Sequence, residues 1–236
     1  MDFKKLVPES REKREMLESV YEYNRRFSLN KEQKKLLERV LVAMAYVDRK
    51  FFYQGEDVYL DNALPIGDGQ TISQPSTVAR MLILSELKEG DDVLEVGGGS
   101  GWNACLIGFL VYPGSVVSVE RIKNLKEKAE KNLARLKKNL KDKGKDFRRL
   151  NNIKFCFENI FEKNHAWKRK YDKIIITAGI EAGDEEKIEN LAKNLLKDKG
   201  ILICPYVAGP LIILKKNENI KRFLTQEEYL FVPLLD

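Results

Sequence analysis

The sequence predicts an α/β fold, namely a Rossmann-like, doubly wound and mostly parallel sheet with an antiparallel C-terminal hairpin and an N-terminal helical appendage. Two observations lead to this prediction. Short apolar, β-branched segments alternate with amphipathic segments between residues 93 and 205. A glycine-rich turn at residues 97–101 joins one such strand to a helix, as in the front half of a nucleotide-binding βαβ unit.

Two amphipathic helices are expected in the appendage, which we place at residues 1–60, ahead of a main domain at residues 61–236. The first helix covers residues 9–27 and the second covers residues 31–46, which Asn30 can cap. Two roles stay open for this appendage at this stage, a lid over a pocket or a contact between subunits.

The segment at residues 66–75 lacks an amphipathic period and is rich in glycine and short polar side chains. Pro75 suits the first position of a helix that runs to about residue 88. Ser73 or Gln74 then lies just outside the helix end. By local chemistry alone, a polar loop with an N-cap is the favoured explanation of this segment.

The glycine-rich turn is the feature that indicates a ligand. It follows a buried strand at residues 93–96, which is interrupted only by Glu95. Gly97, Gly99 and Gly101 can adopt positive φ angles and lack a Cβ, so a ligand can lie against bare backbone. The helix that follows offers free N–H groups and a partial positive charge at its start.

The spacing of these glycines decides which ligand is expected. The dinucleotide pattern Gly-x-Gly-x-x-Gly fails, because its third glycine would fall at Trp102. The next apolar run ends in Glu120, about twenty residues further on, where an acid that binds ribose hydroxyls belongs. A glycine turn that only connects strand and helix is the alternative. The agreement of strand, turn, helix and second acid favours the ligand site.

The rest of the chain continues the alternation of strands and helices. We expect a lysine-rich helix at residues 122–143, an exposed loop at 141–150, and strands at 153–157 and 173–177. The C-terminal part is expected to form a helix at residues 185–196 and strands at 200–205, 211–215, 220–224 and 229–234, the last three supplying the antiparallel hairpin.

Composition and charge narrow the possible classes of function. Hydrophobic residues make up 43% of the chain, which suffices for a core, and no apolar run approaches the length of a membrane span. The net charge of +6 arises mainly at residues 123–145 and 163–173, which could attract RNA or acidic proteins, although solvated helix faces are the simpler explanation. Three scattered cysteines indicate a cytoplasmic location, and the single histidine, His165, argues against a metal site.

Five segments together resemble one family. Ile-Gly-x-Gly-Gln-Thr-Ile-Ser-Gln-Pro ends at Pro75, and Val-Leu-Glu-Val-Gly-x-Gly-Ser-Gly follows after a helix. Val-x-Ser-Val-Glu-Arg ends at Arg121, and Tyr-Asp-Lys-Ile-Ile-Ile-Thr-Ala and Phe-Val-Pro-Leu come later. From residue 35 onwards the chain thereby resembles the protein-L-isoaspartate O-methyltransferases, which are class I S-adenosylmethionine-dependent methyltransferases.

The resemblance implies S-adenosyl-L-methionine as cofactor, S-adenosyl-L-homocysteine as its product, and proteins or peptides carrying L-isoaspartyl residues as acceptors. It implies Ser73 as the catalytic residue, whose hydroxyl would hold the acceptor carboxylate. The cofactor-binding residues that it implies are Gln70, Thr71, Ile72, Glu95, Gly97, Gly99, Ser100, Gly101, Glu120, Arg121, Asn159 and Ile160.

Three places depart from the family's pattern. Gly98 stands where a small hydroxyl residue is common, Asn159 and Ile160 stand for Asp-Gly, and residues 179–183 replace a proline-containing segment that helps to form the acceptor pocket in relatives. Two alternatives therefore stay open: a related methyltransferase that acts on another acceptor such as tRNA, and a cofactor-binding homologue without repair activity. Nucleic acid is the less favoured partner, and the oligomeric state and the preferred acceptor sequence stay open.

Overall fold

A computed structural model describes residues 10–162 and 169–235. Its fold alternates helices with strands from α3 to β5 and again from β6 to β7, as the sequence predicts. The helices are α1 (Arg11–Arg25), α2 (Lys31–Tyr46), α3 (Pro75–Leu84), α4 (Trp102–Val111), α5 (Lys123–Asp142) and α6 (Glu185–Leu195), with short 3₁₀ helices at Arg49–Phe51, Glu56–Tyr59 and Arg148–Leu150. The strands are β1 (Leu64–Gly67), β2 (Gln70–Ile72), β3 (Asp92–Val96), β4 (Ser115–Glu120), β5 (Ile153–Phe157), β6 (Tyr171–Ile176), β7 (Leu196–Pro205), β8 (Ala208–Gly209), β9 (Leu211–Lys216), β10 (Ile220–Leu224) and β11 (Tyr229–Leu230).

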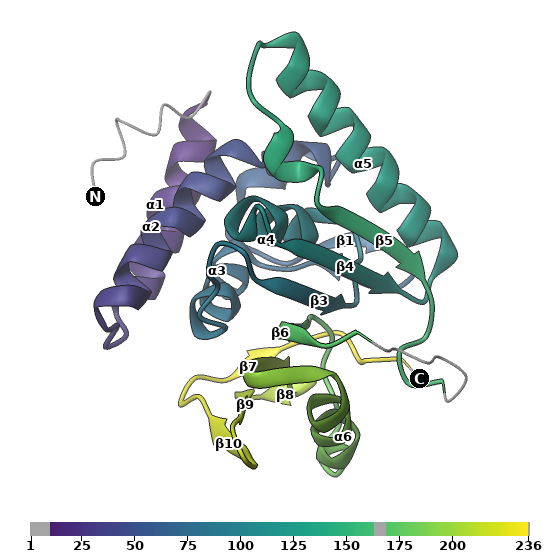
Figure 1. The fold of residues 1–236 in the computed structure, drawn as a ribbon. Coiled ribbons are helices and arrows are strands. Elements are labelled where there is room, and N and C mark those ends of the chain that lie inside the picture. Colours follow the sequence, from purple (N-terminus) through teal and green to yellow (C-terminus); the bar gives the residue numbers. More distant parts are fainter. Residues whose placement is uncertain (1–9, 163–168, 236) are drawn as a thin grey trace.

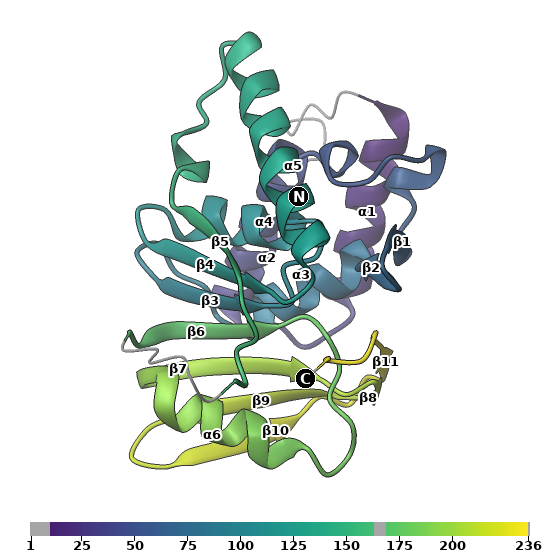
Figure 2. The same cartoon turned by 90° about the vertical axis from the view of Figure 1, so that its right-hand side faces the viewer.

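The main sheet has seven strands in the order β10-β9-β7-β6-β3-β4-β5 (Figure 2). Strands β7, β6, β3, β4 and β5 run parallel to their neighbours within this group, whereas β9 and β10 form the antiparallel end. Two small antiparallel sheets, β1–β2 and β8–β11, stand apart from it. The predicted fold class is therefore confirmed, including the antiparallel C-terminal hairpin.

Both faces of the central strands are buried, which explains why these strands read as continuous apolar runs. In β3, Val93 packs with the helices of one face and Leu94 packs with the opposite face, and both side chains are fully buried. Helices α1 to α5 cover the first face, and α6 covers the second (Figures 1 and 2).

The N-terminal helices pack beside α3 and α4 and share their hydrophobic core (Figure 1). The predicted cap of α2 is confirmed, because the Asn30 side chain accepts from the backbone N–H of Gln33 in a capping box. A buried ion pair of 2.9 Å between Lys13 and Asp48 ties α1 to the segment after α2. The domain boundary at residue 60 stays a prediction.

Two segments of the chain differ from the sequence-based expectations in their strand pairing. The segment around residues 66–75 is not a plain loop, because β1 and β2 form a hairpin whose tip at residues 67–69 has positive φ angles throughout. Strand β7 begins at Leu196, earlier than expected, and a register shift between Tyr171 and Lys173 of β6 accommodates its first residues. These differences arise from pairing with distant strands, which local patterns do not encode.

The C-terminal strand expected at residues 229–234 is shorter than predicted and lies elsewhere. Only Tyr229–Leu230 is a strand, and it pairs with β8 outside the main sheet. Beyond it, the backbone crosses the ends of the central strands: Gly179 N–H donates to the Val232 carbonyl at 2.8 Å, and Leu234 N–H donates to the Gly179 carbonyl at 2.7 Å.

The expected exposed loop at residues 141–150 is largely confirmed, since residues 141–146 and Arg148 are exposed, but its last part is anchored to the core. Leu150 is fully buried and Phe147 packs against the core, while Asp146 and its ion-pair partner Arg148 face solvent. Apolar side chains anchor this connection, because it must return the chain from α5 to the edge strand β5.

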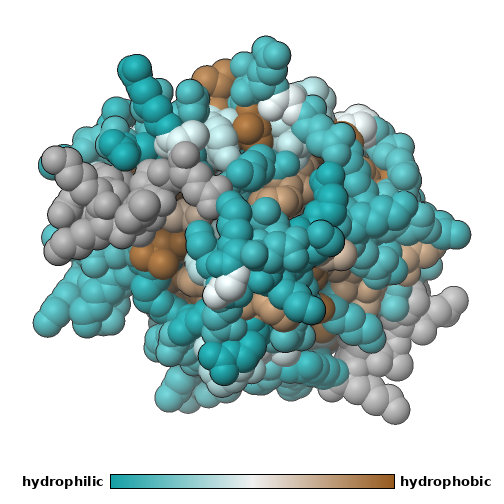
Figure 3. Space-filling model, turned by 90° about the horizontal axis from the view of Figure 1, so that it is seen from above, coloured by the Kyte–Doolittle hydropathy of each residue, from teal (hydrophilic) through white to brown (hydrophobic). Residues whose placement is uncertain are grey.

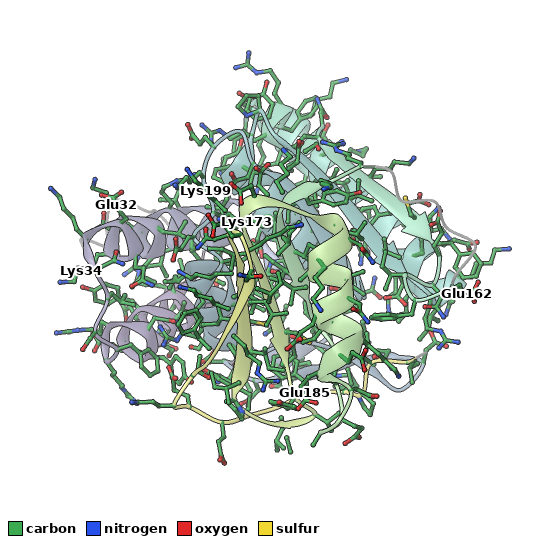
Figure 4. All side chains as sticks on the ribbon, turned by 60° about the horizontal axis from the view of Figure 1, so that its bottom comes forward. Glu32, Lys34, Glu162, Lys173, Glu185 and Lys199 are labelled. Carbon is green, nitrogen blue, oxygen red and sulfur yellow. The ribbon has the colours of Figure 1, made fainter. Side chains whose placement is uncertain are left out.

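Figure 3 shows the surface of the face seen from above. The face seen from above is mainly hydrophilic, with small apolar patches between charged groups (Figure 3). Glu32 and Lys34 point outward from α2, and Lys173 and Lys199 lie at the opposite end of the strands from Glu185 (Figure 4). Over residues 10–162 and 169–235, the helices are too short or too polar to cross a bilayer.

Candidate functional site

A cavity lies at the carboxyl ends of β3, β4 and β6, between the glycine turn and the β1–β2 hairpin. This is the edge at which parallel α/β sheets bind ligands. Of the residues implied by the sequence, those on its wall are Gln70, Thr71, Ile72, Ser73, Glu95, Gly97, Gly99, Ser100, Glu120, Arg121, Asn159 and Ile160.

Gly101 takes a different position, behind the cavity wall. It is the N-cap of α4 with a φ of 84°, and a Cβ there would lie 2.9 Å from the Cβ of Ala129 and 3.1 Å from Phe155. The third glycine therefore lets α4 begin close to α5 and β5, a packing role that the spacing did not distinguish from ligand binding.

The glycine turn is held open by bonds to neighbouring strands. The N–H groups of Gly97 and Gly98 both donate to the carbonyl of Val119, at 2.9 and 3.2 Å. The Thr177 hydroxyl, at the end of β6, donates to the carbonyl of Gly97 at 2.6 Å. At Gly99, with a φ of 52°, a Cβ would meet only Ile66 and the Gly97 carbonyl within 4 Å, so the turn leaves room for a ligand there.

Glu120 ends β4 and lies across from the turn. One oxygen of its carboxylate accepts from Gly99 N–H at 2.9 Å, and the other accepts from Ile122 N–H at 2.8 Å. Only 6% of the residue is exposed. Each carboxylate oxygen has a further acceptor site, so the pair of vicinal hydroxyls of a ribose fits the remaining capacity of this side chain.

Glu95 is the second acid at this edge and is completely buried. Its carboxylate accepts from the Asn103 amide at 2.9 Å and from the Ser118 hydroxyl in a short hydrogen bond. Burial raises the pKa of Glu95 to about 7, and the hydrogen bonds from Ser118 and Asn103 partly oppose that rise. A cationic ligand group would favour the ionised form of this carboxylate.

The structure also accounts for the glycine at position 98. The Ser118 hydroxyl lies 2.5 Å from where a Cβ of Gly98 would stand, on the strand paired with Glu95. A side chain at position 98 would therefore collide with the Ser118 hydroxyl, which already hydrogen-bonds the buried Glu95.

Two further predicted residues have a local structural partner as well as a place on the wall. Ser100 Oγ accepts from Trp102 N–H at 3.3 Å, at the start of α4. Asn159 Oδ1 accepts from Phe161 N–H at 3.0 Å, which fixes the turn after β5 and leaves its NH₂ group to donate. Ile160 is buried against the second face of the sheet. The single histidine, His165, lies outside the described residues.

A second cavity adjoins the first, and Ser73 borders both. Thr71, Thr177 and Val232 also belong to both walls, so the two spaces meet at these four residues. The other residues around the second cavity come from α1, the residue before β1, the start of α3 and the C-terminal segments: Tyr23, Ala63, Gln74, Thr77, Ala208, Gly209, Glu228, Tyr229, Leu230 and Phe231.

The hydroxyl of Ser73 is not used to cap α3. Gln74 occupies the N-cap position and its side chain makes no capping bond. Instead, Asp61 accepts from the backbone N–H of Ser76 at 2.8 Å and from its hydroxyl at 2.6 Å. Within the described part of the chain, no group hydrogen-bonds the Ser73 hydroxyl, which therefore stays available where the two cavities meet.

Comparison with known proteins agrees with this geometry. A family model described as Protein-L-isoaspartate(D-aspartate) O-methyltransferase (PCMT) matches residues 24–236. The chain belongs to this family.

Individual relatives support the assignment across the whole domain. A protein-L-isoaspartate O-methyltransferase of Photobacterium profundum is 40% identical over 204 residues, covering 84% of this chain and 88% of the relative. The enzyme of the same description from Pyrococcus abyssi is 38% identical over 183 residues, covering 75% and 76%. A Plasmodium falciparum protein crystallised with S-adenosyl-L-homocysteine superposes with a TM-score of 0.74 at 25% identity, covering 94% of this chain and 97% of the other. The predicted family, fold class and methyltransferase activity are therefore confirmed.

Residues 179 and 180, which belong to the segment that departs from the family pattern, pack closely against the C-terminal part of this methyltransferase. Gly179 lies against the backbone of Val207, since a Cβ there would be 2.5 Å from the Val207 nitrogen. Ile180 N–H donates to the Pro205 carbonyl, and Val207 N–H donates to the Ile180 carbonyl. Residues 179–180 thus hold the C-terminal segment that walls the second cavity.

Several residues of the site escaped the sequence analysis. Tyr23 of α1 and Tyr229 of β11 face each other at the second cavity, with 3.5 Å between their hydroxyl oxygens. Thr177 and Ser118 contact the glycine turn and its acid from neighbouring strands. Strand register could have revealed Ser118, because parallel pairing places it beside Glu95.

Proposed function

We propose that the chain transfers a methyl group from S-adenosyl-L-methionine to the free carboxylate of L-isoaspartyl residues in damaged proteins and peptides. The position of Ser73 carries the proposal. Its hydroxyl lies where the two cavities meet. The wall of the first cavity includes the glycine turn and Glu120, whose carboxylate can accept from ribose hydroxyls. A donor in the first space and an acceptor in the second would meet beside this hydroxyl.

In the transfer, the acceptor's carboxylate oxygen forms a bond to the methyl carbon while the bond between that carbon and sulfur breaks. The electron pair stays on sulfur, so the products are a methyl ester and S-adenosyl-L-homocysteine. No proton moves, because the carboxylate is already ionised at neutral pH. The chain therefore needs alignment more than a general base, and alignment alone can supply a large part of an acceleration.

The residues on the first wall fit the parts of the donor. Glu120 would accept from the two ribose hydroxyls, and the NH₂ group of Asn159 would donate to the adenine. Glu95, beside the bare backbone of Gly97 and Gly99, would face the methionyl part with its positive amino group. These roles agree with the geometry of the wall, in which both acids are buried and hydrogen-bonded.

Ser73 would donate a hydrogen bond to the acceptor carboxylate and aim its second oxygen at the methyl group. Strand β2 would separate the donor space from the acceptor space everywhere except beside Ser73, through its residues Gln70, Thr71 and Ile72. Exclusion of water favours the reaction, since a sulfonium and a carboxylate both lose their charge in the transition state.

We also propose a cellular location for the enzyme and a role for helix α1. We place the enzyme in the cytoplasm, where thiols stay reduced, because Cys105, Cys156 and Cys204 are free in the structure. Helix α1 would serve as a wall of the acceptor space, through Tyr23, rather than as a subunit contact.

The test is a methyl-transfer assay with labelled S-adenosyl-L-methionine and three acceptors: an L-isoaspartyl peptide, the same peptide with normal aspartate, and bulk tRNA. We expect label in the isoaspartyl peptide only, as a base-labile ester. In Ser73→Ala, turnover should fall about 100-fold while the affinity for S-adenosyl-L-homocysteine changes less than about twofold.

Other outcomes would contradict the proposal in distinct ways. Label in tRNA would identify another acceptor, and cofactor binding without transfer to any acceptor would identify a binding protein. Equal losses of turnover and cofactor affinity in Ser73→Ala would show that the serine supports the fold of the site.

A further inference from the structure

Arg49 is a buried cation that does not line either cavity. It begins the 3₁₀ helix after α2, and its relative exposure is 0%. In the described part of the chain its guanidinium forms no ion pair with a carboxylate. Instead, two of its nitrogens donate to backbone carbonyls only. Burial of this charge is costly and the charge of Asp61 only partly offsets that cost, so the presence of Arg49 calls for a role in the fold or in the site.

The carbonyls bound by Arg49 lie on both sides of the β1–β2 hairpin. Before the hairpin, Nη1 donates to Val58 at 2.9 Å and to Leu60 at 3.0 Å, and Nη2 donates to Asn62 at 2.9 Å. Beyond the hairpin, Nη2 donates to Ser73 at 3.0 Å, with a longer contact of 3.4 Å to Ile72. One side chain thereby ties together the two ends of the segment that forms the gate.

The same guanidinium reaches the cofactor side of the site. Its central carbon lies 5.2 Å from the ring centroid of Trp102, the first residue of α4 after the glycine turn. Trp102 is fixed in turn, because its indole N–H donates to the Val47 carbonyl at 3.0 Å. Arg49 therefore contacts the backbone of Ser73, the residue proposed to hold the acceptor. It also contacts Trp102, the first residue of α4 after the glycine turn.

We propose that Arg49 is a positioning residue for methyl transfer, which sets the distance and angle between the Ser73 hydroxyl and the cofactor turn by binding the Ser73 carbonyl while stacking on Trp102. The proposal rests on the proposed role of Ser73. Arg49 itself touches neither donor nor acceptor, since it lies on neither cavity wall.

Physical chemistry supports an arginine at this place. A guanidinium has five donor hydrogens in a rigid plane, which suits several carbonyls in different directions and stacking on an indole. Burial lowers the pKa of Arg49 to about 10, so the group is still charged at neutral pH and its hydrogen bonds are charge-assisted. A lysine would keep the charge but could not bind both ends of the hairpin and stack at once.

The test compares Arg49→Lys with Arg39→Lys. Arg39 also donates only to carbonyls, those of Leu87 and Leu110, and lies on neither cavity wall, so it controls for the loss of an arginine that binds backbone. We expect kcat for the isoaspartyl peptide to fall about 30- to 100-fold in Arg49→Lys, since small misplacements of reacting groups cost that much. Affinity for S-adenosyl-L-homocysteine should fall less than about threefold, and Arg39→Lys should retain normal kcat.

A double-variant cycle distinguishes positioning from general damage. If Arg49 acts through Ser73, adding Ser73→Ala to Arg49→Lys should cost less than about threefold further in kcat. Rates are taken per folded molecule, with the folded fraction measured by circular dichroism at the assay temperature. The cycle is informative only if Ser73→Ala alone is impaired, so a normal Ser73→Ala enzyme would refute the proposed function separately.

Several results would overturn the positioning role. They are fully additive losses in the double variant, a parallel loss of kcat and cofactor affinity, or unchanged kcat in folded Arg49→Lys. If Arg49→Lys does not fold, Arg49→Gln and Arg49→Met take its place. If none of the three folds, Arg49 is a determinant of the fold and the proposal is refuted.

Discussion

The carboxylate of Glu120 accepts a hydrogen bond of 2.9 Å from the backbone N–H of Gly99, which ties the acid that ends β4 to the glycine turn that follows β3. The acid therefore supports the turn, and we propose that it also binds the cofactor. Replacing Glu120 by Gln removes the charge and points an NH₂ group at one of two N–H donors, Gly99 or Ile122. Loss of a charge-assisted hydrogen bond predicts a 10- to 100-fold weaker affinity for S-adenosyl-L-homocysteine, on the order of 1.5–3 kcal/mol.

Calorimetry checks this prediction, with Glu130→Gln as control. Glu130 lies on α5, half exposed and paired with Lys126, so its replacement should leave cofactor affinity unchanged. Similar affinities for Glu120→Gln and the wild-type chain would remove Glu120 from the cofactor site.

Gly99→Val should abolish cofactor binding without unfolding the chain. The backbone of Gly99 has a φ of 52°, and a Cβ there would project into the cavity beside Ile66. A matched control is Gly144→Val, at the end of α5, where φ is 64° and nothing lies within 4 Å. Both variants should lose about 1–3 kcal/mol of stability through backbone strain. Only the first should lose affinity for S-adenosyl-L-homocysteine, by more than about 100-fold, which equilibrium dialysis would measure.

Cofactor affinity should depend on pH through Glu95. Burial raises its pKa from 4.5 to about 7, so the carboxyl is largely neutral at pH 6 before ligand binds. If its ionised form holds the positive amino group of the cofactor, affinity should fall about tenfold between pH 8 and pH 6. Glu95→Gln should bind weakly at both values and show no such slope. A flat profile in the wild-type chain would contradict the role of Glu95.

The same shift affects stability in a defined direction. A carboxyl whose pKa is raised on folding binds more protons in the folded chain, so it favours the folded state at low pH. That contribution is fully present below about pH 4.5 and is lost as the pH rises through 7. Urea unfolding of Glu95→Gln should therefore show a shallower decline of stability between pH 5 and pH 8 than the wild-type chain.

Arg80 should hold the C-terminal segment in place at the wall of the second cavity, the proposed acceptor space. Its guanidinium carbon lies 4.0 Å from the ring centroid of Phe27, and its Nη2 forms an ion pair of 2.7 Å with Glu227, next to the cavity residue Glu228. Arg80→Leu should cost about 3 kcal/mol in unfolding free energy, because it strands a largely buried carboxylate. Arg80→Leu combined with Glu227→Leu should cost less.

Peptide kinetics give the functional part of that prediction. With the segment 227–230 released, KM for the isoaspartyl peptide should rise several-fold, while affinity for S-adenosyl-L-homocysteine stays unchanged. A normal KM in folded Arg80→Leu would show that the C-terminal segment keeps its place without this ion pair.

The glycine turn and its acids could be predicted because their chemistry is local. Positive φ angles favour glycine, and Glu120 ends its strand at a characteristic distance from the turn, so Gly97, Gly99 and Glu120 were recognisable from spacing alone. Gly101 shows the limit of this reasoning, because a glycine needed for packing against Ala129 looks the same in a sequence as one needed for a ligand.

Ser73 shows the converse limit. Local chemistry made Ser73 a candidate N-cap of α3. In the structure, Asp61, which precedes the β1–β2 hairpin, accepts the hydrogen bonds from Ser76 at the start of α3. The tail after residue 228 was expected to extend the sheet, but its backbone bonds to Gly179 and Val207 carry it across the strand ends. Pairing between distant segments decides such cases, and a single sequence does not contain it.

By itself, the sequence determined the alternation of the central strands and helices, the glycine turn and the family, because hydrophobic period, glycine geometry and motif spacing act over a few neighbouring residues. Tertiary structure alone decided which side chains surround or support the place where the two cavities meet. Arg49, Tyr23 and Thr177 come from separate elements, and the burial of one guanidinium against the carbonyls of a distant hairpin has no local signature.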